Sequence, residues 1–207
     1  MKHLINKKDF SRLEIFEYYN TRSNPFAIIT TKIDITNIYN FCKIKKHYNA
    51  TIGYYLTKAL NQVEEFKYTY ENEIFYKGDT IHPSFTDMRE DLTIGYFLCE
   101  FTDDYNEFIK RYDLQKKAFI KGENTNKEID DSVVWISCEP WFHFSSLVPP
   151  FDKSITIPQL IWDKFSLEND KCFINLMIFI HHGFADGYHI GMFINKVNEL
   201  INNIKLN

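Results

Sequence analysis

The 207-residue sequence is poor in glycine and proline, which together supply 13 residues, 7 and 6 respectively. Disordered chains, collagen-like repeats and flexible linkers are much richer in one or both, so these classes are excluded. Hydrophobic residues make up 44% of the chain and charged residues 25%, which is typical of a globular protein. We therefore expect one domain over residues 1–207, large enough to bury a core.

An excess of basic residues is also missing. Lysine and arginine number 24 against 28 acidic residues, which gives a formal net charge of −4. A nucleic-acid binder needs a basic face to displace counterions, and a polybasic membrane anchor needs clustered lysine and arginine. The composition argues against both kinds of partner.

Cysteine is scarce and widely spaced. The four are Cys42, Cys99, Cys138 and Cys172. They form no CxxC pair, so we expect neither a disulfide framework nor a cysteine-based zinc site. The longest apolar run, 172–180, is too short to span a bilayer, and the polar segment 1–8 does not resemble a signal peptide. We expect a cytoplasmic protein.

Hydrophobic periodicity predicts an α/β protein. Helices are expected at 9–19, 36–41, 50–63, after Thr102-Asp103, and over 190–204, and strands at 26–35, 92–101, 133–136 and 171–180, with a hairpin at 67–76. The polar stretch 122–131 is expected to be a loop. Such an order favours a two-layer sandwich in which helices pack on a mixed β-sheet.

The most informative segment is 180–189, where an apolar strand ends in two adjacent histidines. Neighbouring side chains on a strand point to opposite faces, so only one of His181 and His182 can face a given cleft. Histidine is the side chain best suited to moving a proton near neutral pH. Asp186 follows where the chain turns into the last helix, and it can orient a partner or cap that helix.

Two other interpretations of this segment stay open. His182, Asp186 and His189 have a spacing compatible with metal binding. However, the chain must bend at Gly183 and Gly187, so the three side chains need not converge, and we expect no metal. The histidines could also be core residues with a structural role only.

The segment resembles the C-terminal signature of the chloramphenicol acetyltransferase family, trimeric acetyl-CoA-dependent enzymes with an HHxxxDG motif. Condensation domains of nonribosomal peptide synthetases share that motif, and plant acyltransferases and dihydrolipoyl acyltransferase cores have related ones. Five further stretches agree with the family in order and spacing. They are 10–19 (W-x-R-K-x-x-F in the family), 32–36 (V-D-I-T), 65–67 (E-F-R), 81–86 (H-P-x-Y-T) and 137–141 (S-x-x-P-W).

This resemblance implies the fold of the CoA-dependent acyltransferases and a role for several residues. His182 matches the general base that takes the proton from an acceptor hydroxyl as it attacks acetyl-CoA. Ser137 matches the serine whose hydroxyl stabilises the tetrahedral oxyanion, a contribution of about 3–4 kcal/mol to the barrier. Asp186 matches the aspartate that pairs with an N-terminal arginine, here Arg12, and this pair is expected to be structural. Tyr19 matches an aromatic residue near the acceptor.

Coenzyme A contacts are also implied by the resemblance. Lys46, Tyr48 and Lys164 fall near family positions that contact the nucleotide end of the coenzyme. Cationic groups at such positions suit phosphates, although lysine is also the commonest kind of solvated surface residue.

Two stretches depart from the family. Ile161 stands where the family has a threonine that helps to hold a water at the reaction centre, and 147–150 replaces a run that walls the chloramphenicol pocket. The expected function is therefore an acetyl-CoA-dependent O-acetyltransferase, acting as a homotrimer with active sites between subunits and with chloramphenicol as the favoured acceptor, which would confer antibiotic resistance. The alternatives are another hydroxylated small molecule as acceptor, or a trimeric binding protein that has lost efficient chemistry.

Overall fold

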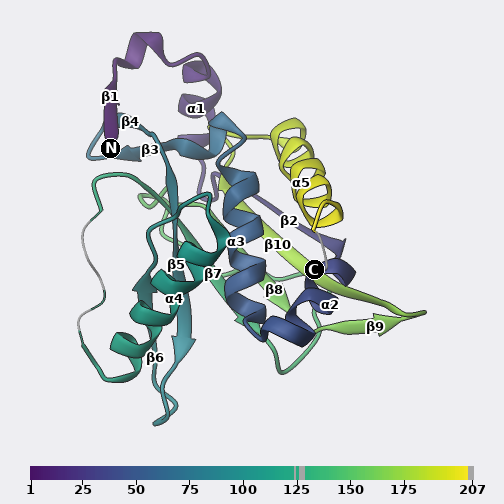
Figure 1. Ribbon diagram of the computed structural model, residues 1–207. Helices are drawn as coiled ribbons and strands as arrows, with labels where there is room; N and C mark the ends of the chain where they lie inside the picture. Colours follow the sequence, from purple (N-terminus) through teal and green to yellow (C-terminus); the bar gives the residue numbers. More distant parts are fainter. Residues whose placement is uncertain (124, 126–128, 205–207) are drawn as a thin grey trace.

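The structure, a computed structural model, describes residues 1–123, 125 and 129–204 (Figure 1). Its strands are β1 (Lys2–Ile5), β2 (Phe26–Asp34), β3 (Tyr68–Glu71), β4 (Ile74–Gly78), β5 (Ile81–Met88), β6 (Ile94–Leu98), β7 (Ser132–Glu139), β8 (Gln159–Asp163), β9 (Ser166–Glu168) and β10 (Lys171–His181). Its α-helices are α1 (Leu13–Asn20), α2 (Thr36–Lys45), α3 (Tyr48–Leu60), α4 (Tyr105–Ile120) and α5 (Gly187–Asn202), and the 3-10 helices η1 (Lys7–Asp9) and η2 (Glu64–Lys67) complete the set.

A mixed sheet forms the centre of the molecule, with the strand order β2-β10-β8-β7-β5-β6. The pairs β5–β7 and β7–β8 are parallel, and the other pairs in this order are antiparallel. β9 folds back against the start of β10. Helices α2 to α5 lie together on one face of this sheet, which confirms the predicted α/β class (Figure 1).

The main core lies between the sheet and these helices. On β7, Val134 and Ile136 are buried in this core, so Trp135 and Ser137 point to the opposite face of the sheet. Helix α3 is central and approaches β5 closely. A Cβ atom on Gly53 would lie 2.5 Å from the ring of Phe85, so only glycine permits this packing.

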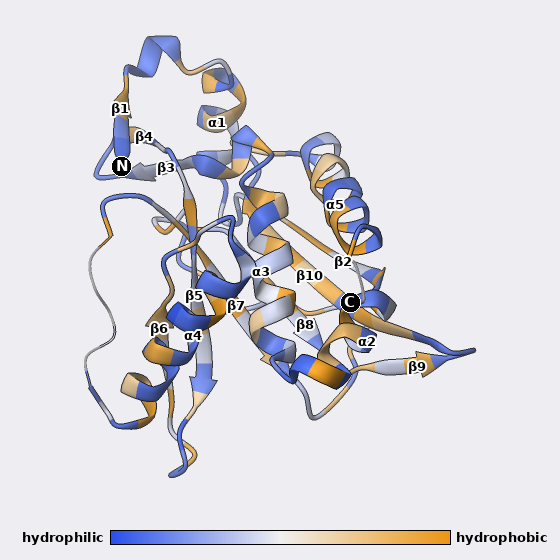
Figure 2. Ribbon diagram, in the orientation of Figure 1, coloured by the Kyte–Doolittle hydropathy of each residue, from blue (hydrophilic) through white to orange (hydrophobic). Residues whose placement is uncertain are grey.

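A second, smaller core covers the opposite face of the sheet. It consists of Phe26, Phe144, Ile161, Met177 and Phe179. Apolar residues, orange in Figure 2, run along β10 between the two cores.

The segment 140–156 crosses this second core, and a fully buried carboxylate ties it to the sheet. Asp163 accepts the backbone N–H of Asn175 at 2.7 Å and that of Phe144 at 3.3 Å. These bonds replace the hydration that the buried carboxylate loses.

An aromatic cluster joins the chain's beginning to its end. Phe10, Phe16, Phe75 and Phe184 are all buried and pack together. The rings of Phe16 and Phe184 lie 5.1 Å apart between centroids, so α1 rests directly on the turn before α5. The small sheet β1-β4-β3 contributes Phe75 and covers one side of this cluster.

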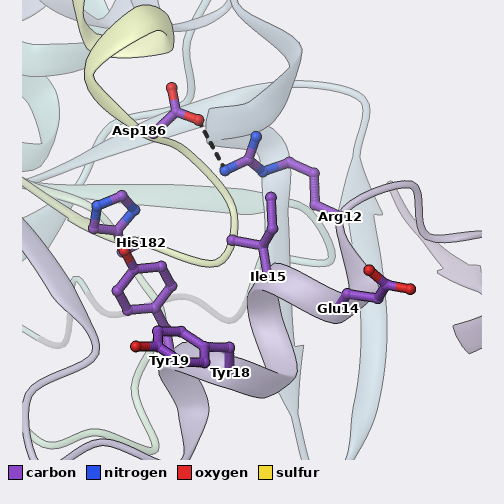
Figure 3. A pocket seen from close by; sticks show the side chains of 7 residues that line it. All are labelled: Arg12, Glu14, Ile15, Tyr18, Tyr19, His182 and Asp186. Atoms are coloured by element: carbon purple, nitrogen blue, oxygen red, sulfur yellow. Dashed lines mark ion pairs between the residues drawn. The ribbon is translucent and has the colours of Figure 1, made fainter.

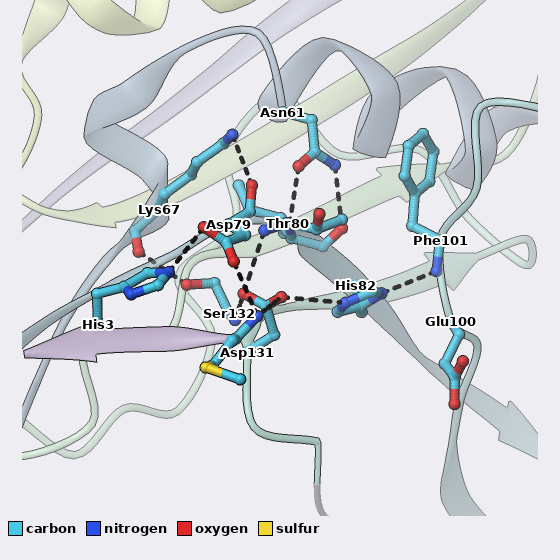
Figure 4. A network of polar contacts seen from close by, with 12 residues as sticks. His3, Asn61, Lys67, Asp79, Thr80, His82, Glu100, Phe101, Asp131 and Ser132 are labelled. Atoms are coloured by element: carbon cyan, nitrogen blue, oxygen red, sulfur yellow. Dashed lines mark hydrogen bonds and ion pairs between the residues drawn. The ribbon is translucent and has the colours of Figure 1, made fainter.

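A polar network fastens the start of β5, the segment beyond β6 and the start of β7 (Figure 4). Asp131 accepts the backbone N–H groups of Thr80 and Ser132. His82 Nδ1 accepts the N–H of Phe101 at 2.9 Å, and burial lowers the pKa of His82 below its usual value. The His-Pro stretch at 82–83 therefore holds strands together.

Several predicted elements are present with shifted bounds. The hairpin is confirmed: β3 and β4 are joined at Asn72 and Glu73, both with positive φ, the backbone of a tight two-residue turn. The first helix begins at Leu13 instead of residue 9, because η1 precedes it. Helix α4 is capped by Asp104, not by the predicted Thr102-Asp103. Helix α2 begins at Thr36, with Ile35 as its N-cap.

Three strands of the central sheet, β5, β8 and the short β9, have no counterpart among the predicted elements. The predicted loop at 122–131 includes residues 124 and 126–128, which lie outside the described residues. None of the described helices is both long enough and apolar enough to cross a membrane.

Candidate active site

The histidine pair lies where the central strand β10 ends. His181 is its last residue, and His182 donates its backbone N–H to the carbonyl oxygen of Pro25 at 2.8 Å. The N–H of Phe184 then bonds back to the carbonyl of His181 at 2.9 Å, which closes a tight turn before α5. A buried strand, a turn and a helix thus fix the backbone around His182.

The two histidines point to different surroundings, as predicted. His181 is fully buried, with its ring stacked on Phe16 at 4.6 Å between centroids. Its Nδ1 accepts the N–H of Gly183 at 3.1 Å. Burial, together with the neighbouring His182, lowers the pKa of His181 to about 4. His181 is therefore neutral and structural.

His182 is half-buried and faces a hollow. Its ring stacks on Tyr19 with the centroids 4.1 Å apart and an interplanar angle of 6° (Figure 3). Its Nδ1 is buried and makes no hydrogen bond within the described residues. The other ring nitrogen, Nε2, is the one that remains accessible for proton transfer.

Arg12 holds the turn that follows His182 at two points. Its Nε donates to the carbonyl oxygen of Gly183 at 3.2 Å, and its Nη2 lies 3.1 Å from Oδ2 of Asp186 (Figure 3). The Arg12 side chain is 16% exposed, so this ion pair is only partly screened by solvent. A guanidinium can make both contacts at once, which a lysine cannot do in this geometry.

Asp186 is also the N-cap of α5. Its Oδ1 accepts the N–H of Tyr188 at 3.0 Å, the standard way to satisfy a free N–H at a helix start. Burial alone would raise the pKa of Asp186, but the Tyr188 N–H, His189 and Arg12 outweigh it and hold this pKa below its usual value. Asp186 therefore both caps the helix and pairs with a cation.

The glycines of this turn differ in what they permit. A Cβ atom on Gly183 would lie 2.6 Å from Cα of Phe16, so glycine is required there by close packing. A Cβ on Gly187 would meet nothing within 4 Å, and Gly187 does not have a positive φ. The bend at Gly187 therefore does not depend on glycine. Among the residues described, no cluster of histidine, cysteine and acidic groups suits a metal ion.

The hollow that His182 faces has a volume of about 380 Å³, and we call it the histidine hollow. It is lined by Arg12, Glu14, Ile15, Tyr18, Tyr19, His182 and Asp186. Four residues predicted for the site, namely Arg12, Tyr19, His182 and Asp186, thus come together although α1 and the turn are far apart in sequence.

Ser137 lies elsewhere, in a hollow of about 310 Å³ that we call the serine hollow. Its lining is Asn49, Thr86, Asp87, Met88, Ile94, Ser137, Cys138, Glu139, Pro140 and Trp141. Burial raises the pKa of Glu139, which faces the same space. Within one chain, therefore, Ser137 and His182 do not share a hollow.

The residues predicted to contact coenzyme A lie in two separate segments of the chain. Tyr48 begins α3 and lines a hollow of about 420 Å³ with His47, Asn49 and Asp113. Asn49 lines the serine hollow as well, so these two hollows adjoin. Lys46, two residues before Tyr48, has a positive φ of 66°.

Lys164 lies in the second of these segments, the loop after β8. It is exposed, follows β8 directly, and donates its backbone N–H to the carbonyl of Phe142 at 3.3 Å. Its side chain is therefore free to reach an anionic group in solvent.

Sequence reasoning missed a fourth hollow, of about 240 Å³, on the same face of the sheet as Ser137. We call it the aromatic hollow, and its lining is Trp135, Pro150, Phe151, Asp152, Ile155 and Gln159. Trp135 lies two residues before Ser137 on β7, and Gln159 is its direct partner on β8. The alternation of β7 could have revealed Trp135, because Val134 and Ile136 occupy the opposite face.

Solved structures that superpose on this chain identify its fold. A chloramphenicol acetyltransferase superposes with a TM-score of 0.82 at 20% identity, over 97% of this chain and all of the other. A catalytic core of a 2-oxoacid dehydrogenase multienzyme complex from Thermoplasma acidophilum gives 0.72 at 14% identity, over 94% and 95%. The fold is that of the CoA-dependent acyltransferases.

The family is narrower than this class. The family model "Chloramphenicol acetyltransferase" matches residues 2–198, so the chain belongs to the chloramphenicol acetyltransferase family and is an acyltransferase. A chloramphenicol acetyltransferase of Clostridium perfringens is 30% identical over 207 residues, covering 96% of this chain and 97% of the relative. Chloramphenicol acetyltransferase 3 of Escherichia coli is 28% identical over 208 residues, covering 94% of each.

Proposed function

We propose that the protein transfers an acetyl group from acetyl-CoA to a hydroxyl of chloramphenicol, with His182 as the general base. The observation that carries this proposal is the position of His182, whose backbone is fixed by Pro25 and whose ring is fixed by Tyr19. Because Nε2 is the accessible nitrogen, the neutral ring would carry its proton on Nδ1 and present the Nε2 lone pair to the hollow.

The chemistry then proceeds directly between the two substrates. His182 Nε2 removes the hydroxyl proton as the acceptor oxygen attacks the thioester carbonyl carbon, and the C=O electron pair moves onto its oxygen. The Ser137 hydroxyl donates a hydrogen bond to that oxyanion. When the carbonyl re-forms, the C–S bond breaks, and the thiolate of coenzyme A takes the proton held by His182.

A single chain does not bring these two residues into one hollow, which favours a homotrimer with shared sites. His182 of one subunit would meet Ser137 of its neighbour. Side chains beside both residues support such an interface, because Tyr18 near His182 and Trp141 near Ser137 are 57% and 61% exposed. Large exposed aromatic residues are typical of surfaces that another protein covers.

Acetyl-CoA would enter along the two adjoining hollows that share Asn49. Tyr48 lines one of these hollows, Lys46 lies two residues before it, and Lys164 is exposed on a separate loop. Lysine side chains at such an entrance suit the phosphates of the coenzyme. We place the reaction in the cytoplasm, in keeping with four cysteines that are all free thiols.

A second candidate acceptor, a different hydroxylated small molecule, is favoured by the departures near Ser137. Ile161 is the direct partner of Ser137 on β8 and has no hydrogen-bonding group where the family has a threonine. Gln159 and Trp135 give the aromatic hollow a mixed polar and aromatic lining. If the loss of the threonine also slows the chemistry, the protein would be a trimeric binding homologue.

The deciding experiment measures thiol release from acetyl-CoA by the purified protein, with and without chloramphenicol. We expect drug-dependent release that His182→Ala abolishes and Ser137→Ala lowers by about 10²–10³-fold. His3→Ala is the matched control, since that histidine is exposed and lies outside all four hollows. Release that is unchanged in His182→Ala would refute the proposed base.

Release only with other hydroxyl compounds would replace chloramphenicol by the second candidate acceptor. Binding of acetyl-CoA without release, for every acceptor in a panel, would favour the binding homologue. The mass of the protein in solution tests the trimer separately, and a monomer would refute the shared site.

A further inference from the structure

The stretch Glu65-Phe66-Lys67, which resembles E-F-R of the family, has no task in the proposed reaction. The structure places its glutamate next to the turn that carries His182. Glu65 belongs to η2, and its Oε1 lies 3.4 Å from Nε2 of His189 in the first turn of α5. The other ring nitrogen of His189, Nδ1, lies 2.9 Å from Oδ1 of Asp186. His189 thus stands between two carboxylates.

The two contacts bear on which form of the ring fits this position. A neutral imidazole has one N–H and one lone pair. With the proton on Nδ1, the lone pair of Nε2 would face Glu65, and with the proton on Nε2, the lone pair of Nδ1 would face Asp186. Both arrangements are repulsive. An imidazolium donates a hydrogen bond from Nδ1 to Asp186 and brings its positive charge to Glu65, so both contacts are attractive.

The backbone N–H of Asp186 also points at His189 Nδ1, at 3.3 Å. This contact would require Nδ1 to accept a hydrogen bond. It is longer than the 2.9 Å approach to the carboxylate, and a bond between two neutral groups is weaker than one between two charges. The carboxylate contact therefore decides the state of the ring.

Four ionisable side chains form a chain of contacts: Arg12, Asp186, His189 and Glu65. Their side chains are 16%, 33%, 11% and 27% exposed, so solvent screens the chain only in part. They come from the segment before α1, the N-cap and first turn of α5, and η2. This chain of contacts joins the segment before α1, the start of α5 and η2 around the turn that follows His182.

We propose that His189, held as a cation between Asp186 and Glu65, is a positioning residue for His182. Arg12 holds the carbonyl of Gly183 and the carboxylate of Asp186, and His189 holds the same carboxylate from the other side. His182 directly precedes this clamped turn. The proposal rests on the proposed function in one respect, namely that His182 is the base whose placement matters.

The test uses Glu65→Gln in the intact protein, because this change keeps the size of the side chain and removes its charge. Glu64→Gln is the matched control. Glu64 is the neighbouring residue of η2, but its carboxylate accepts from Lys77 Nζ at 2.6 Å and from the Tyr68 hydroxyl at 3.1 Å, away from His189. Each variant loses one ion pair, but only Glu65→Gln alters the chain of contacts from Arg12 to Glu65.

The first measurement is nitrogen-15 NMR of the histidine rings at neutral pH without substrates, with His189→Gln assigning the signal. In the unaltered protein both nitrogens of His189 should have the shifts of a protonated ring. In Glu65→Gln they should become those of a neutral ring, and the His182 signals should move, whereas Glu64→Gln should leave both unchanged. A neutral His189 in the unaltered protein would overturn the proposal, as would His182 signals that do not respond to Glu65→Gln.

The second measurement is turnover with acetyl-CoA and an accepted substrate. Glu65→Gln should lower kcat by about tenfold to a hundredfold, the size expected for a misplaced catalytic group, with KM for acetyl-CoA unchanged. Glu64→Gln should keep kcat within about twofold. An unchanged kcat in Glu65→Gln refutes positioning. A protein that transfers no acetyl group refutes the proposed function instead, and the NMR measurement still decides the role of His189.

Discussion

The buried His181 makes the stability of the protein depend on pH in a defined way. Its pKa is lowered from the ordinary 6.5 to about 4, chiefly by burial. Between these two values the unfolded chain binds a proton that the folded chain does not, so stability rises with pH across this window. Each pH unit within this window changes the free energy of unfolding by about 1.36 kcal/mol. The free energy of unfolding therefore falls by about 3 kcal/mol when the pH falls from 6.5 to 4.

We would measure the free energy of unfolding by urea at several pH values from 7.5 to 4, at one protein concentration. The His181→Gln variant should be less stable than the unaltered protein at pH 7.5, and the difference should shrink by about 3 kcal/mol toward pH 4. The control is Phe179→Leu, a buried residue without a titrating group, whose deficit should stay constant with pH. Parallel curves for His181→Gln and the unaltered protein would refute the reasoning.

Three further predictions concern the turn, the floor of the site and the coenzyme entrance. Gly183→Ala should lower the free energy of unfolding by about 1–3 kcal/mol because its Cβ meets Phe16, whereas Gly187→Ala should not, and equal losses in urea denaturation would contradict this. Ile161→Thr should raise kcat while lowering stability by about 1–3 kcal/mol, since a hydroxyl replaces buried apolar atoms, and an unchanged kcat would show that the threonine is not what is missing. Lys46→Gly should stabilise the chain by about 1 kcal/mol because φ is positive there, while raising KM for acetyl-CoA, and an unchanged KM would count against a phosphate contact.

The parts of the fold that could be predicted are those whose pattern is local. The hairpin at Asn72 and Glu73 and the helix α5 have their signals within a few residues of each other. β8 was missed because it is buried along its whole length and shows no alternation of apolar and polar residues. β5 does alternate over 81–86, but Pro83 in its middle argues against a central strand. Both strands are defined by the strands that they pair with in the folded sheet.

The candidate site likewise has features that the local sequence predicts and features that it does not. That only one of two adjacent histidines faces a cleft follows from the strand geometry alone, and the structure agrees. The pairing of Arg12 with Asp186 came only from the family resemblance, because 174 positions separate them and no spacing rule reaches that far. The contact of Glu65 with His189 had no local signal either, since it depends on how η2 meets α5.

A shared active site has one consequence that a site within one chain cannot imitate. His182 follows the end of β10, whereas Ser137 lies on β7 beyond β8, and the two residues line different hollows. His182→Ala and Ser137→Ala should each be nearly inactive alone. When the two variants are unfolded together and refolded as a mixture, random assembly should restore both groups at about one quarter of the sites, because each site draws one residue from each of two subunits. About a quarter of the activity should return, and no recovery in mixed assemblies, verified by mass, would mean that His182 and Ser137 do not act across a subunit boundary.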